Sequence, residues 1–326
     1  MKRQTIYLSV FCIALSAILI CMPVMAEGGG DGSGMGDGGN TEVAYILAGL
    51  SSMKFILGGT AALSGLILLK TIKINRNIRT LLMCTVFVLF GLVVILHQPS
   101  PLRAVVDPVT ALATGSAISL KKATMLAFIG GLSVIGAKLF CGWVCPFGAL
   151  QEIVNNIPVP FGKKIKLPFK ISNTIRISIF AISLIMVIST GSDLYTYQNI
   201  LNPFELFDWN FELVLAVLVG VILVASIFMY RPFCYLICPV GLLTWMLEYV
   251  SIFRVRLDRE KCNNCKKCIL KSPCPSVKAI LDGDTLRPDC FACGACIDAC
   301  PKDALEFGIW KKAKACTFSL FKRIRL

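Results

Sequence analysis

Long apolar segments dominate this sequence. Hydrophobic residues make up 56% of its 326 residues and charged residues only 16%, whereas soluble globular proteins carry about 25% charged residues. After an apolar run at the N-terminus, five more follow at residues 43–69, 80–96, 123–140, 175–190 and 212–230. A helix that crosses a bilayer needs about 20 apolar residues, within a range of about 17–25. The composition therefore excludes a purely soluble enzyme. It predicts an α-helical multi-pass membrane domain at residues 43–250, with about five spans after the N-terminal segment.

The N-terminal segment has the features of a signal peptide. Met1-Lys2-Arg3 precedes an apolar run, and Val24-Met25-Ala26 provides the small residues of a cleavage site. Because the run is longer than the usual 7–15 residues, residues 1–26 are predicted to be either a cleaved signal peptide or an uncleaved anchor helix. Residues 27–42 are rich in Gly and Asp, and they predict a flexible linker on the outer side.

The distribution of charge predicts the topology. Lys and Arg concentrate in residues 70–79, 141–176 and 251–326, while residues 191–211 carry none. Cytoplasmic loops of membrane proteins are enriched in these residues, so we expect the C-terminus to lie in the cytoplasm and the protein in the cytoplasmic (inner) membrane. Residues 97–122 fit this pattern least well. The net charge of +14 therefore reflects membrane topology, and no nucleic-acid partner is expected.

One motif occurs twice, 93 residues apart. Lys138–Leu150 and Arg231–Leu243 both read [KR]-x-F-C-x-x-x-C-P-x-G-x-L. Asp107-Pro108 and Asn202-Pro203 precede the two copies at similar distances. The membrane domain is therefore predicted to contain two pseudo-repeated helix hairpins, related by an axis along the membrane normal.

The duplicated motif supplies four cysteines at the predicted cytoplasmic face. They are Cys141, Cys145, Cys234 and Cys238. Cysteines four residues apart share one face of a continuous helix. The four thiols could hold one iron–sulfur cluster or another soft metal, or act as two redox-active dithiols. Lys138 and Arg231, three residues before the first cysteine of each copy, would favour a thiolate or an anionic cluster. The alternative is that they anchor the helices at the inner membrane surface.

Eight further cysteines predict a small α+β ferredoxin domain of the bacterial two-cluster type at residues 251–307. The second of its two runs, which ends at Cys300-Pro301, has the C-x2-C-x2-C-x3-C-P spacing without alteration. In such pairs of runs the fourth cysteine of each ligates the other cluster. We therefore assign Cys262, Cys265, Cys268 and Cys300 to the first 4Fe-4S cluster. The second cluster takes Cys274, Cys290, Cys293 and Cys296. Five residues rather than three precede Cys274, and we expect them to loosen this ligand loop and change the potential of its cluster.

The remaining candidates are isolated. His97, the single histidine, ends the second predicted span and could exchange a proton with a quinol; its alternative is an ordinary interfacial polar residue. One histidine and no C-x-x-C-H motif exclude most haem sites, so no haem is expected. Residues 308–326 predict a basic amphipathic tail that lies on anionic lipid as a helix, with a disordered basic tail as the alternative. Four cysteines outside the motifs are expected to pack as apolar residues: Cys12, Cys21, Cys84 and Cys316.

The twin motif followed by the two-cluster module resembles the polyferredoxin-like membrane iron–sulfur proteins of the NapH, NosR and CcoG type, over about residues 70–307. The resemblance implies an electron-transfer subunit of an oxidoreductase system rather than a stand-alone enzyme. It would relay electrons between a quinone, flavin or cytoplasmic donor and a respiratory redox partner. Its expected partners are the lipid bilayer, the quinone pool and a redox subunit of the soluble ferredoxin, flavin or outer reductase type. Its cofactors would be two 4Fe-4S clusters, with a third cluster or another metal at the twin motif. A copper-centre assembly or reduction factor like CcoG is the alternative.

Overall fold

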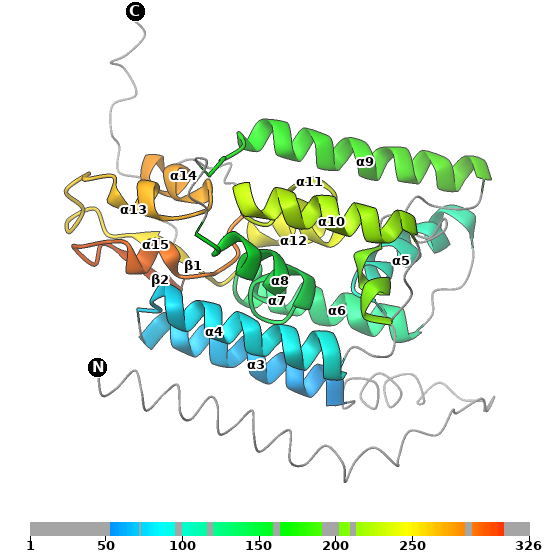
Figure 1. Ribbon diagram of the computed structural model, residues 1–326, viewed down its shortest axis with the longest axis horizontal. Helices are drawn as coiled ribbons and strands as arrows, with labels where there is room; N and C mark the ends of the chain where they lie inside the picture. The colour runs from blue at the N-terminus through cyan, green and yellow to red at the C-terminus, as the bar shows by residue number, and fades with distance from the viewer. Residues whose placement is uncertain are drawn as a thin grey trace, which may run out of the picture.

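The computed structural model describes residues 53–71, 73–94, 100–115, 120–158, 164–190, 202–208, 213–283 and 289–309. The predicted signal segment and linker, His97 and the chain beyond residue 309 lie outside the described residues, as do Cys12, Cys21 and Cys316. The protein is mostly helical, with a small two-stranded sheet at one end (Figure 1).

Each of the five predicted apolar runs falls on a helix. These are α3 (Met53–Thr71), α4 (Arg76–Val86) with its π-helical continuation η2 (Phe87–Val94), α6 (Leu120–Ile135), α9 (Phe169–Thr190) and α10 (Leu213–Phe228). Among the described residues one helix, Phe169–Ser189, is long and apolar enough to cross a bilayer. The apolar stretches Phe55–Thr71, Lys122–Ile135 and Leu213–Phe228 are shorter.

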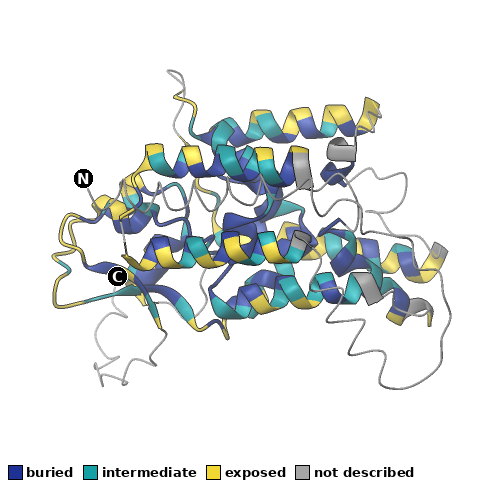
Figure 2. Ribbon diagram, turned by 90° about the horizontal axis from the view of Figure 1, so that it is seen from below, coloured by how far each residue is buried: buried dark blue, intermediate teal, exposed yellow. Residues whose placement is uncertain are grey.

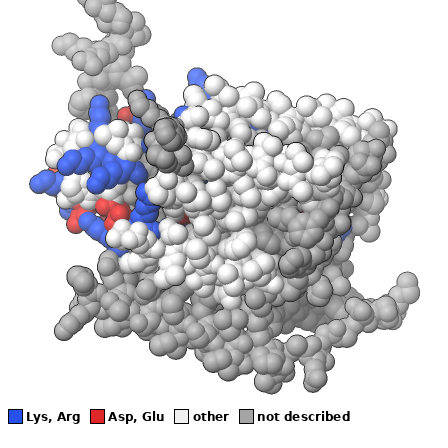
Figure 3. Space-filling model, viewed as in Figure 1, with Lys and Arg blue, Asp and Glu red and all other residues white. Residues whose placement is uncertain are grey.

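Large apolar side chains cover the outward faces of these helices. On α9, Ile185 and Ile188 are 64% and 71% exposed, and on α10 Val221 is 62% exposed. Exposed residues recur along the outer faces of the long helices (Figure 2), and uncharged side chains cover the wide face over these helices (Figure 3). Contiguous apolar surface of this kind is unusual on soluble monomers and typical of surfaces that contact a membrane or another protein.

Short helices follow α6 and α10 at equal spacing. The first two are α7 (Leu139–Trp143) and α8 (Pro146–Asn155), and the second two are α11 (Pro232–Leu236) and α12 (Pro239–Glu248). Each bound of the second pair lies 93 residues after its counterpart. The shorter elements α5 (Arg103–Thr114) and η4 (Pro203–Asp208) precede α6 and α10.

The two cysteines of each motif do not share one continuous helix, contrary to the expectation from their spacing. Cys145 is the N-cap of α8, with extended backbone angles φ −68° and ψ 115°, and Cys238 is the N-cap of α12, with φ −70° and ψ 119°. The reason is the proline that follows each of them. Proline disfavours the helical conformation of the preceding residue, but it is well suited to the first position of a new helix.

The ferredoxin module packs against the ends of these helices and is not a separate lobe (Figure 1). Strand β1 (Phe253–Leu257) pairs antiparallel with β2 (Leu305–Ile309), with Val255 opposite Phe307. β2 thus continues two residues past the predicted domain boundary at residue 307. Between the strands lie the short helices α13 (Lys267–Lys271), α14 (Ser276–Asp282) and α15 (Ala295–Asp298). One hydrophobic core contains buried residues of both parts.

Candidate iron–sulfur site

The four cysteines of the twin motif line one cavity. Its volume is about 340 Å³, including the part open to solvent, and aromatic rings and Val240 complete much of its wall. Cys141, Cys234 and Cys238 are buried, Cys145 is partly buried, and all four thiols are free. Among the described residues, no three His, Cys, Asp or Glu side chains gather closely enough to hold a single metal ion.

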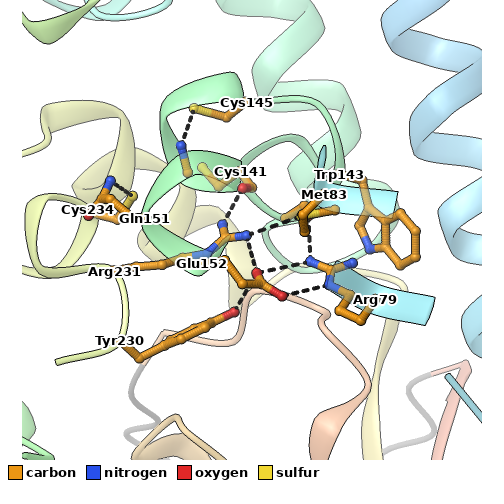
Figure 4. A network of polar contacts seen from close by, with 12 residues as sticks. Arg79, Met83, Cys141, Trp143, Cys145, Gln151, Glu152, Tyr230, Arg231 and Cys234 are labelled. Atoms are coloured by element: carbon orange, nitrogen blue, oxygen red, sulfur yellow. Dashed lines mark hydrogen bonds and ion pairs between the residues drawn. The ribbon is translucent and has the colours of Figure 1, made fainter. Parts of the chain in front are cut away.

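Each motif contributes a polar side chain to the first cysteine of the other. Gln151 on α8 donates a hydrogen bond to the Cys234 sulfur at 3.8 Å (Figure 4), and the Thr244 hydroxyl on α12 lies 3.8 Å from the Cys141 sulfur. Gln151 and Thr244 occupy the same place in the two copies, 93 residues apart. Neither residue was predicted as part of the site, although polar side chains at equivalent positions of two apolar helices could have indicated it.

The glycine of each motif allows a helix to approach the first cysteine closely. A Cβ atom on Gly241 would lie 2.5 Å from the carbonyl oxygen of Cys234, and one on Gly148 would lie 3.0 Å from that of Cys141. No side chain fits at Gly241 without a shift of the backbone. The glycine of the pattern C-P-x-G therefore allows α8 and α12 to pack closely against the short helices that precede them.

The two motif cations lie in the interior and do not anchor helices at the membrane surface. Lys138 and Arg231 are both 0% exposed. Lys138 forms an ion pair with Asp289 and donates to the carbonyl oxygen of Gly241 at 2.5 Å. Arg231 pairs with Glu152 at 2.5 Å and donates to the carbonyl oxygen of Cys141. Each cation thus reaches across to the other motif.

Two more buried arginines complete a pair of charge clusters. Arg79 binds Glu152 at 2.8 Å and Arg176 binds Asp289 at 3.1 Å. Tyr230 donates to Glu152 at 2.9 Å. Each carboxylate is thereby shared by two cations, as Figure 4 shows for Glu152. Neither carboxylate could be predicted, since nothing in the local sequence of Glu152 or Asp289 reveals its distant partners.

These six side chains leave an excess of two buried positive charges. One nitrogen of each arginine (Arg79 Nη1, Arg176 Nε and Arg231 Nε) is buried without a hydrogen-bond partner. Burying unpaired charge is costly, so the arrangement suits an anionic group nearby. Four thiolates around an iron–sulfur core, which together carry a net charge of about −2, provide such a group. The donor atoms and the charge at this site therefore fit a 4Fe-4S cluster.

The loop predicted to carry ligands of the second ferredoxin cluster packs against the twin motif. The indole nitrogen of Trp143 donates to the carbonyl oxygen of Ala292 at 3.0 Å, and the Lys138 amide donates to that of Cys290 at 3.3 Å. The buried Phe291 ring stacks edge-on against Tyr235, with 5.2 Å between the centroids. Residues 289–293 of the ferredoxin module thus contact residues of both copies of the twin motif.

Burial and neighbouring thiols raise the pKa of four of the eight ferredoxin cysteines. Burial raises the pKa of Cys290 and Cys296, and that of Cys293 to about 11, and the nearby Cys274 contributes to all three increases. Burial also raises the pKa of Cys268, to which Cys300 and Cys265 contribute. Cys274, the last cysteine of the first run, thus lies near the first three cysteines of the second run, and Cys300 lies near Cys268, as expected if each run supplies the fourth ligand of the other cluster. Such thiols hold their protons until a metal displaces them.

The extra residues before Cys274 are fixed by a short helix and by hydrogen bonds from Lys166, whereas the spacing predicted a loose loop. Ile269 and Leu270 belong to α13. The Lys166 ammonium donates to the carbonyl oxygens of Ile269 and Ser272, each at 2.6 Å. The longer spacing therefore provides a contact between the ferredoxin module and the segment that joins α8 to α9.

The comparisons with known proteins agree with this geometry. A family described as a 4Fe-4S binding domain matches residues 123–168 and 211–259, and each match contains one copy of the twin motif. The putative electron transport protein YccM of Escherichia coli is 26% identical over 65% of this chain and 63% of its own length. The ferredoxin-type protein NapH of Haemophilus influenzae is 28% identical over 54% of this chain and 63% of its own.

An uncharacterised protein of Methanocaldococcus jannaschii is 32% identical over 58% of this chain and 70% of its own length. The chain thus spans a little under two thirds of YccM and of this NapH. No solved structure matches. The twin motif, the two-cluster module and these relatives together show that the chain belongs to the polyferredoxin-like membrane iron–sulfur proteins, the family that includes NapH and NosR.

Proposed function

We propose that this protein relays electrons through iron–sulfur clusters between a donor and a respiratory redox partner at the inner membrane. The observation that carries the proposal is the contact of residues 289–293, in the ferredoxin module, with Lys138 and Trp143 of the twin motif. Cofactors that exchange electrons must lie close together, and this loop, which carries ligands of the second ferredoxin cluster in our proposal, contacts the twin motif. The donor is a quinone, a flavin or a cytoplasmic carrier.

The ferredoxin module holds two 4Fe-4S clusters in this proposal. Cys262, Cys265, Cys268 and Cys300 ligate the first. Cys274, Cys290, Cys293 and Cys296 ligate the second. Cys274 helps to raise the pKa values of Cys290, Cys293 and Cys296, and Cys300 helps to raise that of Cys268, which supports this assignment.

A third cluster occupies the cavity of the twin motif, ligated by Cys141, Cys145, Cys234 and Cys238. Its support is the excess of two buried positive charges beside the four thiols. A pair of disulfides would be neutral and would leave this charge without compensation, whereas a cluster with four thiolates balances it.

The membrane domain is a duplicated unit whose five apolar helices cross the bilayer, with the ferredoxin module in the cytoplasm. Three observations support this proposal. The helix bounds recur after 93 residues, the family match occurs twice, and exposed apolar side chains cover the helices. Lys73 and Lys166, from the basic segments at residues 70–79 and 141–176, contact the ferredoxin module.

Iron analysis tests the number of clusters. Protein purified without oxygen is expected to contain about twelve irons and twelve sulfides per chain, that is, three 4Fe-4S clusters. The double variant Cys141→Ser with Cys234→Ser should fall to about eight irons and lose one EPR signal on reduction. Cys84→Ser, a cysteine outside the motifs, should keep all twelve and is the control.

Two results would contradict these proposals. Eight irons in both the unmodified protein and the double variant would remove the third cluster. Copper bound to the twin motif, together with clusters that no quinol, flavin or ferredoxin donor can reduce, would remove the relay and favour a copper assembly factor.

A further inference from the structure

The two ferredoxin cluster sites differ in their exposure. In the first group Cys265 is exposed and Cys262 is partly buried. In the second group Cys274, Cys293 and Cys296 are buried and Cys290 is partly buried, against the twin motif. The first cluster therefore faces solvent and the second faces the protein interior. Electrons from a soluble protein would enter or leave at the first cluster.

Positive charge surrounds the exposed ligand. In the loop and helix from residue 259 to residue 271 the exposed cations are Arg259, Lys261, Lys266, Lys267 and Lys271. Glu260 is the exposed acid of this stretch, and Asp258, which pairs with Lys261, is half-buried. Figure 3 shows Lys and Arg gathered at this end of the molecule, in contrast to the uncharged surface of the helices. We call the exposed cations of residues 259–271 the basic rim.

An apolar side chain stands within the basic rim. Leu270, between the two exposed lysines of α13, is 80% exposed. Apolar contact near a redox centre, surrounded by charge, suits the small and transient interfaces of electron-transfer encounters. The charge then guides the approach of the partner and sets the rate of association rather than the final affinity.

The position of the basic rim favours a protein over lipid headgroups. Helix α13 lies at the end of the long axis of the molecule, beyond the ends of the long helices (Figure 1). Basic residues on the near side of the module have partners inside the protein: Lys73 pairs with Asp303, and Lys166 binds the carbonyl oxygens of α13 and Ser272. A bilayer around the apolar helix faces would meet these residues first.

We infer that the basic rim around Cys265 is the docking surface for a small acidic electron carrier of the iron–sulfur or flavin class. The inference rests on the proposed relay. A cluster held by Cys262, Cys265, Cys268 and Cys300 would accept one electron from the reduced carrier, with no bond or proton changing place. Residues 289–293 would then connect the ligands of the second cluster to the twin motif.

The test uses a plant-type 2Fe-2S ferredoxin as the acidic probe. The full-length protein is placed in nanodiscs of phosphatidylcholine, and its reduction by the reduced ferredoxin is followed by stopped-flow absorbance. Reversing two charges, with Lys267→Glu and Lys271→Glu, should lower the second-order rate constant about tenfold or more at low salt. The difference should shrink near 1 M salt, where the screening length is only about 3 Å.

The matched control carries the same change of net charge elsewhere. Lys170 on α9 and Lys278 on α14 are exposed and lie outside the basic rim, and the variant Lys170→Glu with Lys278→Glu should change the rate constant less than about twofold. Unchanged iron content in both variants shows that the clusters are intact. Equal rate constants for the two variants would overturn the inference.

Two further readouts separate the other interpretations. In nanodiscs that also contain phosphatidylglycerol, a docking surface for proteins keeps the difference between the unmodified protein and the rim variant. Loss of that difference would mean that the basic rim binds anionic lipid, and would overturn the inference.

Binding of labelled, oxidised ferredoxin is measured by fluorescence anisotropy. Salt-dependent binding that the rim variant loses, without any electron transfer, would support the docking surface while contradicting the proposed relay.

Discussion

Replacing Glu152 by glutamine is expected to lower the free energy of unfolding by about 3–5 kcal/mol. The substitution keeps the size of the side chain but removes the charge that Arg79 and Arg231 share at 2.8 and 2.5 Å. Both arginines would then stay buried without a counter-charge, and breaking a buried ion pair on one side has this cost. The measurement is the midpoint of denaturant or thermal unfolding in detergent.

The control is the same chemical change on the protein surface. Glu306 pairs with Arg256 at 2.6 Å, but its side chain is 57% exposed. Glu306→Gln should therefore change the free energy of unfolding by about 1 kcal/mol or less. Equal shifts for Glu152→Gln and Glu306→Gln would show that the interior cluster does not stabilise the fold.

Replacing Gly142 by alanine is expected to push the ferredoxin ligand loop away from the twin motif. The new Cβ atom would lie 2.1 Å from the carbonyl oxygen of Phe291. Because that neighbour is backbone, it cannot rotate aside, and overpacking of this kind costs about 1–3 kcal/mol or more. We expect a lower unfolding midpoint. If the proposed clusters are present, reduction of the one at the twin motif by dithionite-reduced ferredoxin should lag behind reduction of the two in the ferredoxin module.

Gly220→Ala provides the comparison within a helix. A Cβ atom on Gly220 in α10 would meet nothing within 4 Å, and alanine favours a helix over glycine by about 1 kcal/mol. This variant should be neutral or slightly more stable, and its three clusters should be reduced as in the unmodified protein. Normal reduction in Gly142→Ala would mean that the contact between residues 289–293 and α7 carries no electrons.

Local patterns in the sequence predicted most of the elements and the candidate ligands. Apolar runs located the long helices because a helix that faces an apolar environment needs few polar residues. The duplicated motif also predicted a duplicated local structure, and α7–α8 and α11–α12 recur at the same offset of 93 residues. The expectation of a shared helix face was wrong, because the spacing rule assumes a continuous helix and Pro146 and Pro239 each start a new one.

Contacts between distant segments could not be predicted in the same way. Lys138 was a candidate for an anchor at the membrane surface, but in the structure it pairs with Asp289, which lies 151 positions later. Gln151 and Thr244 reach the cysteines of the opposite motif, although a single sequence gives no measure of which helix faces which. Long-range pairs of this kind depend on the whole packing arrangement rather than on neighbouring residues.

Local features of the chain identify the residues that can carry the chemistry: twelve motif cysteines, two copies of one motif, and the apolar helices around them. These features can be predicted because ligand spacing, hydrophobic patterning and proline act over a few residues. Packing brings four thiols to one cavity, gives Glu152 and Asp289 two buried cations each, and sets residues 289–293 against the twin motif. None of this could be predicted, since burial and charge pairing depend on distances in space, and those distances exist only after the segments have packed together.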